Sequence, residues 1–137
     1  MTRVIYASKG GNTKKLAEAI ARGAGVSAVP VAQITTLEPT DILFVGASIY
    51  AGSIDGVLRH FLEELTPEQV KTVAVFGSAA RKNTVLPLIK AALAPSGIAV
   101  CEESFHCSGS FLFLNRGRPN EEDLQQAEAF AKRVCNT

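Results

Sequence analysis

The sequence predicts a doubly wound α/β fold, in which helices cover both faces of a parallel sheet. Short segments rich in Val, Ile and Phe alternate with longer segments whose apolar residues recur at helical spacing. Two of the short segments, Asp41–Ser48 and Lys71–Ser78, are almost continuously apolar, which is typical of parallel strands buried on both faces. Parallel neighbours need a crossover connection, and the helices between the strands would supply it.

The chain is predicted to open as a strand, a loop and a helix. Arg3–Ala7 is a short apolar run that leads into a glycine-containing loop, and it is followed by a predicted helix over Thr13–Arg22. Gly23 is expected to end this helix in the left-handed conformation. The second predicted strand is Val26–Val31, and Pro30 places it at an edge or a strand end because proline cannot donate a ladder hydrogen bond.

The middle of the chain contains the strongest helical pattern. Residues 32–40 are too short for a full helix, so we expect only a degenerate turn before the third strand, Asp41–Ser48. A helix is then predicted from an N-cap at Ser53. Its apolar stripe consists of Ile54, Val57, Leu58, Phe61, Leu62 and Leu65. The fourth strand is Lys71–Ser78.

The last third of the chain repeats the alternation. A third helix is marked by Val85, Ile89, Ala92 and Leu93. Ile98–Cys107 resembles a fifth strand, and Asn120 with Asp123 is expected to cap the final helix. We find no repeat and no stretch typical of a linker, so the sequence predicts a single domain over residues 1–137.

Composition excludes several classes of function. The formal net charge is +1, which favours no nucleic-acid partner. Apolar runs of about five residues fall far short of the ~20 that span a bilayer, so no membrane insertion is expected. No secretory signal follows Met1, and the three cysteines form no C-x-x-C pair. We therefore expect a cytoplasmic monomer with reduced thiols and no metal site.

The loop after the first strand carries groups that suit a phosphate. It consists of Ser8, Lys9, Gly10, Gly11, Asn12 and Thr13. These residues offer hydroxyls, an amide, glycines for a tight bend and the backbone N–H groups of a helix start. Ligands of open parallel sheets bind beyond the carboxyl ends of the strands, and this loop lies there. The Walker and dinucleotide patterns are absent, and no acid follows the first strand as in a phosphoacceptor domain.

At this loop the chain resembles the flavodoxin family, whose [ST]-x-T-G-N-T loop binds the phosphate of FMN. Here Gly10 stands where the family has a central Thr, which removes one hydroxyl. The resemblance extends over nearly the whole chain in element order and length. It implies a flavodoxin-like five-stranded parallel sheet in the order 2-1-3-4-5, and FMN as the cofactor. Flavodoxins are themselves an example of the rule that places ligands at this edge of the sheet.

The resemblance also implies two loops that hold the flavin ring. The first consists of Ser48, Ile49, Tyr50, Ala51 and Gly52. Tyr50 would stack on one face of the ring, and the peptide between Ala51 and Gly52 would flip to bond the flavin N5. An ordinary half-buried tyrosine at a strand end remains the other reading of Tyr50. The second loop consists of Gly77, Ser78, Ala79, Ala80 and Arg81, and its backbone amides would face the pyrimidine edge.

The second loop departs from the family pattern, because it lacks the aromatic residue that relatives place over the other face of the ring. Arg81 and Lys82 would bring positive charge close to the reduced flavin, which predicts a less negative reduction potential than in acidic relatives. The alternative is that both cations are solvated at a helix entry. In the stretch Ser108–Pro119, the apolar run Phe111–Leu114 is followed by two arginines. This stretch would cover the open side of the flavin, form a short edge strand over the final helix or dock a redox partner.

The leading functional hypothesis is an FMN-binding electron-transfer protein that shuttles electrons between a reductase and an acceptor protein. One alternative is an oxidoreductase on the same fold, such as a quinone reductase or a protoporphyrinogen dehydrogenase. Another is a flavin-free interaction module. Neither a G-x-S-x-G elbow nor a histidine metal pair occurs, and neither His60 nor His106 is given a catalytic role.

Overall fold

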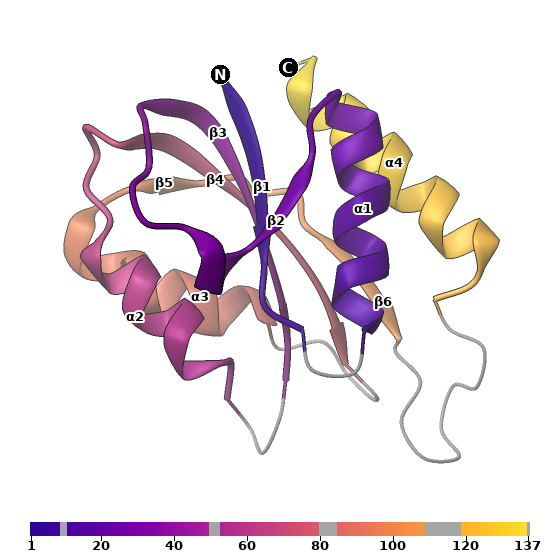
Figure 1. Ribbon diagram of the computed structural model, residues 1–137, viewed down its shortest axis with the longest axis horizontal. Helices are drawn as coiled ribbons and strands as arrows, with labels where there is room; N and C mark the ends of the chain where they lie inside the picture. Colours follow the sequence, from indigo (N-terminus) through magenta and orange to yellow (C-terminus); the bar gives the residue numbers. More distant parts are fainter. Residues whose placement is uncertain (9–10, 50–52, 80–84, 109–118, 137) are drawn as a thin grey trace.

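The computed structural model describes residues 1–8, 11–49, 53–79, 85–108 and 119–136. It contains a parallel sheet with the strand order β2-β1-β3-β4-β5, and β6 also pairs with β4 (Figure 1). The strands are β1 (Thr2–Tyr6), β2 (Ala28–Pro30), β3 (Thr40–Ser48), β4 (Val70–Ala79), β5 (Ala99–Val100) and β6 (Phe105–Ser108). The predicted fold class and strand order are therefore confirmed.

Helices cover both faces of the sheet (Figure 1). The α-helices are α1 (Asn12–Ala24), α2 (Gly56–Glu64), α3 (Val85–Leu93) and α4 (Glu121–Cys135), and two short 3₁₀ turns are η1 (Val31–Gln33) and η2 (Ala94–Ser96). Helices α1 and α4 pack on one face, and α2 and α3 pack on the other. Successive strand residues point to opposite faces, so Phe44 joins the first layer and Val45 the second.

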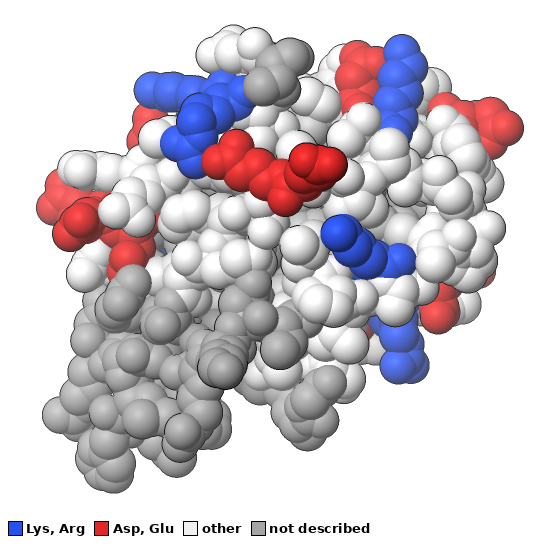
Figure 2. All heavy atoms as spheres, turned by 180° about the vertical axis from the view of Figure 1, so that it is seen from behind, with Lys and Arg blue, Asp and Glu red and all other residues white. Residues whose placement is uncertain are grey.

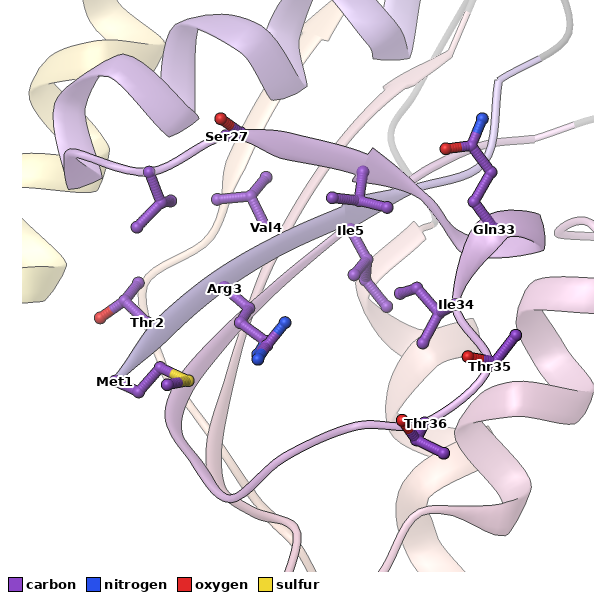
Figure 3. Close-up of a pocket in the computed structure, with 12 residues that line it drawn as sticks. Met1, Thr2, Arg3, Val4, Ile5, Ser27, Gln33, Ile34, Thr35 and Thr36 are labelled. Atoms are coloured by element: carbon purple, nitrogen blue, oxygen red, sulfur yellow. The ribbon is translucent and has the colours of Figure 1, made fainter.

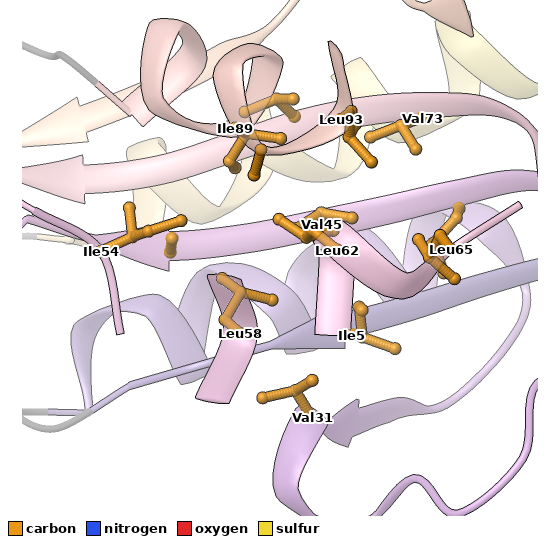
Figure 4. Packing of buried hydrophobic residues seen from close by; sticks show 14 of the residues in the cluster. Ile5, Val31, Val45, Ile54, Leu58, Leu62, Leu65, Val73, Ile89 and Leu93 are labelled. Atoms are coloured by element: carbon orange, nitrogen blue, oxygen red, sulfur yellow. The ribbon is translucent and has the colours of Figure 1, made fainter. Parts of the chain in front are cut away.

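The buried side chains of the layer under α2 and α3 are aliphatic, and the partly buried Phe61 packs against them (Figure 4). Leu58 and Leu62 of α2 meet Ile89 of α3 above Val45 of β3, and all four are fully buried. The opposite layer contains aromatic rings. Phe130 of α4 packs edge-on against Phe44, with ring centroids 6.0 Å apart and an interplanar angle of 79°.

The first helix is longer than predicted, because Gly23 does not end it. Helix α1 continues to Ala24, and Gly25 takes the left-handed C-cap with φ of 75°. Gly23 instead lies where α1 crosses α4, and a Cβ there would stand only 2.3 Å from the carbonyl oxygen of Glu128. The glycine serves close helix packing, which the local sequence did not reveal.

The N-cap of the second helix lies two residues later than predicted. Asp55, and not Ser53, is the N-cap of α2, because its carboxylate accepts hydrogen bonds from the backbone N–H groups of Val57 and Leu58. The prediction that Val57 belongs to the apolar stripe is wrong, because its side chain lies on the outer face of α2 and is 57% exposed. Ile54 and Leu65 are buried as expected but flank the helix.

The predicted fifth strand is interrupted. Residues 99–100 pair with residues 72–73 of β4, and residues 105–108 pair with 76–79. Four residues, 101–104, therefore stand opposite two residues of β4, so the chain bulges outward and β5 and β6 form separately. The predicted capping box of the last helix is confirmed, since Asn120 and Asp123 bond each other's backbone N–H groups.

Basic and acidic side chains lie interspersed on the face shown in Figure 2, which agrees with the formal net charge of +1.

The degenerate turn expected between β2 and β3 is the single 3₁₀ turn η1. Among the helices of the described residues, none combines the length and hydropathy that crossing a bilayer requires.

Candidate functional site

The candidate site lies where β1, β3 and β4 end, at the same edge of the sheet (Figure 1). The backbone N–H of Ala7, just beyond β1, still bonds the carbonyl of Gly46 at 3.0 Å. Ser48 at the end of β3 is the register partner of Ser78 in β4. The first turn of α1 begins directly after the loop that follows β1. Three segments that are distant in sequence therefore meet here.

Three buried hydroxyls form a closed triangle at this edge, which we name the hydroxyl triangle: Thr13, Ser48 and Ser78. The Oγ atoms of Ser48 and Ser78 are 3.1 Å apart, and Thr13 Oγ1 lies 3.0 Å from Ser78 Oγ. Thr13 and Ser48 are also in hydrogen-bond contact. The three residues are 0%, 7% and 3% exposed. Each hydroxyl carries one hydrogen and can accept another, so three hydrogens satisfy three contacts.

The triangle ties α1 to β3 and β4. Thr13 is on the first turn of the helix, whereas Ser48 and Ser78 belong to neighbouring strands. A shift of any one of these segments would break two of the three contacts and leave buried hydroxyls unsatisfied, at a cost of about 1–3 kcal/mol for each unpaired group. The geometry thus fixes the start of α1 relative to the sheet.

The start of α1 is suited to an anion. Gly11 is its N-cap in the left-handed conformation, with φ of 87°, and its N–H donates to Ser8 Oγ at 3.0 Å. Within the described residues no side chain caps this helix, and its first turn has no acid but carries Lys14 and Lys15. The helix dipole and the lysines both favour negative charge here.

Two other helices differ from α1 in this respect. The N-terminus of α2 is capped by the Asp55 carboxylate, and that of α4 by the Asn120 side chain. Helix α4 also carries three acids in its first turn. A bound anion would compete with these groups at α2 and α4, but not at α1.

Gly77 was predicted as a site residue, and the structure gives it a packing role. A Cβ at this position would lie 2.7 Å from the carbonyl oxygen of Ala47 and 2.7 Å from Val85 Cγ2. The glycine therefore allows β4 to approach β3 and α3 closely. Its neighbour Ser78 is the residue whose side chain reaches the site.

The structure describes nine of the sixteen predicted site residues: Ser8, Gly11, Asn12, Thr13, Ser48, Ile49, Gly77, Ser78 and Ala79. It brings Thr13, Ser48 and Ser78 into contact and places Ser8 against Gly11. The remaining predicted residues lie outside the described residues: Lys9, Gly10, Tyr50, Ala51, Gly52, Ala80 and Arg81. The same is true of Lys82 and of Phe111–Leu114.

The contact of the Ser78 side chain was missed, because only backbone amides were expected from that loop. The positions of the two serines along their strands could have predicted this contact. Ser48 and Ser78 each follow a small residue at the end of a buried apolar strand, so pairing the two strands in parallel brings the hydroxyls level.

His106 lies beside the site on β6, where its register partner is Gly77. Its Nε2 is 2.7 Å from Ser104 Oγ, and its buried Nδ1 has no hydrogen-bond partner in the described part of the chain. Burial lowers the pKa of this imidazole from its ordinary value. The ring is therefore neutral near pH 7.

A cavity of about 370 Å³ adjoins the start of α1 and is bordered by Ser8, Gly11, Lys14, Val31 and Asp55. A larger cavity of about 430 Å³ lies elsewhere, between the amino ends of β1 and β2 and the chain after η1 (Figure 3). Only the first of these borders the site described above.

Comparison with known proteins gives a consistent result. The sequence model of the family described as Flavodoxin domain matches residues 3–97. An uncharacterised protein of Methanocaldococcus jannaschii is 27% identical over 135 residues, which cover 90% of this chain and 89% of that protein.

Solved structures show the same fold. The structure of a flavodoxin from the domain Archaea aligns with a TM-score of 0.81 at 21% identity, covering 98% of this chain and 96% of the other. A short-chain flavodoxin associated with a bacterial microcompartment aligns with a TM-score of 0.74 at 21% identity, covering 99% and 97%.

Proposed function

This chain belongs to the flavodoxin domain family, and we propose that it binds FMN and transfers electrons between a reductase and an acceptor protein. Bound FMN supplies one- and two-electron redox chemistry, whereas the protein binds the cofactor, orients it and tunes its surroundings. On this proposal no side chain forms or breaks a covalent bond.

The observation that carries the proposal is the start of α1. It combines backbone donors without a side-chain cap, two lysines and the hydroxyl of Thr13, with Ser8 beside them. The donors that a phosphate group needs are present, and within the described residues no acid lies in that turn to repel it. The residues thus fit the phosphate end of FMN.

Thr13 has a particular role in this proposal. Its hydroxyl is held at a fixed position by Ser48 and Ser78, so it would meet a phosphate without first losing side-chain freedom. Tyr50 is proposed to stack on one face of the ring, and the peptide between Ala51 and Gly52 is proposed to face its N5 edge. The backbone of the loop from Ser78 to Arg81 is proposed to contact the pyrimidine edge.

The test is a binding comparison between FMN and riboflavin, which differ only in the phosphate. The purified chain is first inspected for the visible absorption of flavin, then stripped and titrated with each ligand by flavin fluorescence. We expect FMN to bind at least about tenfold more tightly, because charge-assisted hydrogen bonds contribute about 1.5–3 kcal/mol. Equal affinities, or no binding of either flavin, would contradict the proposal.

A second measurement separates a carrier from an enzyme. The FMN-loaded protein is mixed with NADH or NADPH and a soluble quinone, with and without an added flavodoxin reductase. A carrier is expected to turn over only when the reductase is present. Turnover without it would instead support the quinone-reductase alternative.

A further inference from the structure

The cavity of about 430 Å³ lies at the opposite edge of the sheet from the proposed flavin site (Figure 3). β2 pairs with β1 only from Val4 onward, so Thr2 and Arg3 have β3 as a partner on one side and no β2 partner on the other. The connection between β2 and β3 is a single 3₁₀ turn instead of a helix. The cavity occupies the space that this short connection leaves beside β1.

The lining of this cavity is amphipathic. Its apolar part includes Ile5, Val29 and Ile34, and its polar part includes Ser27, Gln33, Thr35 and Thr36. Among the described residues that line it, none is acidic and Arg3 is the one cationic side chain. The amino group of Met1, which also borders the cavity, is already paired with Asp41 at 2.5 Å.

Arg3 is incompletely satisfied. It projects from the same face of β1 as Ile5, and Figure 3 shows its guanidinium on the side of Ile34 and Thr36. Its Nη2 lies 3.4 Å from the carboxylate of Glu38, a long contact, and Glu38 is 69% exposed. The Nε atom is buried and has no hydrogen-bond partner among the described residues. A buried guanidinium N–H without an acceptor is unfavourable, so a ligand that supplied an acceptor at Arg3 would relieve this cost.

We infer that this cavity binds a small aliphatic monocarboxylate. The ligand carboxylate would replace Glu38 at Nη2 of Arg3, and a rotation of the side chain that uncovers Nε would let it accept from both atoms together. This is the side-on geometry that the guanidinium fork prefers. Its aliphatic chain would lie against Ile5 and Ile34. A single cation beside an apolar surface favours a singly charged amphiphile over a compact multivalent anion. This site does not depend on flavin binding.

The test is an NMR titration of the ¹⁵N-labelled full chain with hexanoate and, as a neutral ligand of equal length, 1-hexanol. We expect hexanoate to shift the Arg3 Nε–H resonance and the backbone amides of residues 2–5, while hexanol at the same concentrations leaves the Nε–H unshifted. Inorganic phosphate is expected to bind at least about tenfold more weakly than hexanoate, because it gains nothing from the apolar surface.

Two substitutions act in opposite directions. Arg3→Gln should weaken hexanoate binding at least about tenfold, the scale of a lost charge-assisted hydrogen bond. Glu38→Gln should tighten binding several-fold, since it removes both the competing carboxylate and its repulsion. Because Glu38 is exposed, Glu38→Gln is not expected to disturb the fold. Its effect on hexanoate affinity therefore tests the inference even if Arg3→Gln disturbs the fold.

The matched control is Arg22→Gln, because Arg22 is an exposed arginine of α1 that does not line the cavity. It is expected to leave hexanoate affinity unchanged. Equal binding of hexanol and hexanoate, equal binding of phosphate, or an Arg3→Gln variant that binds hexanoate as the parent does would each overturn the inference.

Discussion

The hydroxyl triangle of Thr13, Ser48 and Ser78 shows how three small side chains connect the segments of the candidate site. In the free protein three hydrogens fill three contacts. If Thr13 turned its hydrogen toward a phosphate, only two hydrogens would remain for the three contacts. Ser48 and Ser78 could still both donate to Thr13, so Thr13 would keep its position while gaining the phosphate as a third partner.

Ser78→Ala is expected to reduce FMN affinity without affecting riboflavin affinity. The substitution removes one of the two groups that hold the Thr13 hydroxyl, and one such hydrogen bond contributes about 0.5–1.5 kcal/mol, or roughly two- to twelvefold in affinity. Fluorescence titration with both flavins measures the effect. Ser53→Ala, at an exposed serine, is the matched control and should change neither affinity. An equal loss for both flavins would show that Ser78 acts on the ring or on the fold instead.

His106 is expected to make stability depend on pH. Burial lowers the pKa of its imidazole below the ordinary value of 6.5, so the unfolded chain binds a proton more readily than the folded one. The free energy of unfolding should therefore be independent of the His106 proton above pH 6.5. Below pH 6.5 it should fall as the pH drops, by at most about 1.4 kcal/mol per pH unit for one proton.

Urea unfolding at pH 7.5 and pH 5.5 measures this effect. His106→Gln should show a smaller loss of stability between the two pH values than the parent chain. His60→Gln is the control, because His60 is exposed on α2. If His106→Gln lost as much stability between pH 7.5 and pH 5.5 as the parent chain does, the pH dependence would not come from His106.

At the scale of elements, hydrophobic spacing predicted where helices and strands occur, but tertiary contacts decided where they end. Ser53 and Asp55 are both good N-cap residues, and periodicity alone cannot choose between them. The extension of α1 past Gly23 depends on its crossing with α4, which lies about a hundred residues later in the chain. The bulge at residues 101–104 is likewise set by pairing with β4.

Gly23→Ala is expected to destabilise the protein by about 1–3 kcal/mol, the usual range for overpacking. The added Cβ would meet the backbone of α4, which cannot rotate away as a side chain can. Gly56→Ala is the matched control, because a Cβ there meets no atom of the described residues within 4 Å outside its chain neighbours and its own helical backbone, and alanine favours helix. Chemical denaturation compares both variants with the parent. Equal stabilities for the two variants would show that α1 and α4 separate easily.

At the scale of the whole molecule, the order of strands and helices was predictable because it depends on alternating local patterns. The candidate site was predictable only in part. The loop after β1 has a distinctive composition, so the sequence predicts Ser8 and Gly11–Thr13 as site residues, and the structure places Ser8 against Gly11 and Thr13 against Ser78. The Ser78 contact depends on strand register, and Arg3 appears in the sequence as an ordinary strand residue. Its surroundings follow from the short connection after β2. The sequence predicts that this connection is only a turn, but not the path that it takes beside β1.

The two packed layers should contribute independently to stability yet unfold together. Ile89 and Phe130 are fully buried in separate clusters on opposite faces of the sheet. We expect Ile89→Val and Phe130→Leu each to lower the free energy of unfolding by about 1 kcal/mol, and the double variant to lower it by the sum within about 0.5 kcal/mol.

Both layers share the strands of one sheet, so neither can lose its packing without exposing the back of the other. We therefore propose that residues 1–137 unfold as a single domain, in one transition. Circular dichroism reports the helices of both layers. Tyrosine fluorescence, measured in a Tyr50→Phe background so that Tyr6 is the remaining tyrosine, reports the layer under α1 and α4. In the parent and in each of the three variants, the urea midpoint measured by circular dichroism should equal the midpoint measured by tyrosine fluorescence. If Phe130→Leu shifted the tyrosine midpoint alone, the layers would be separate folding units.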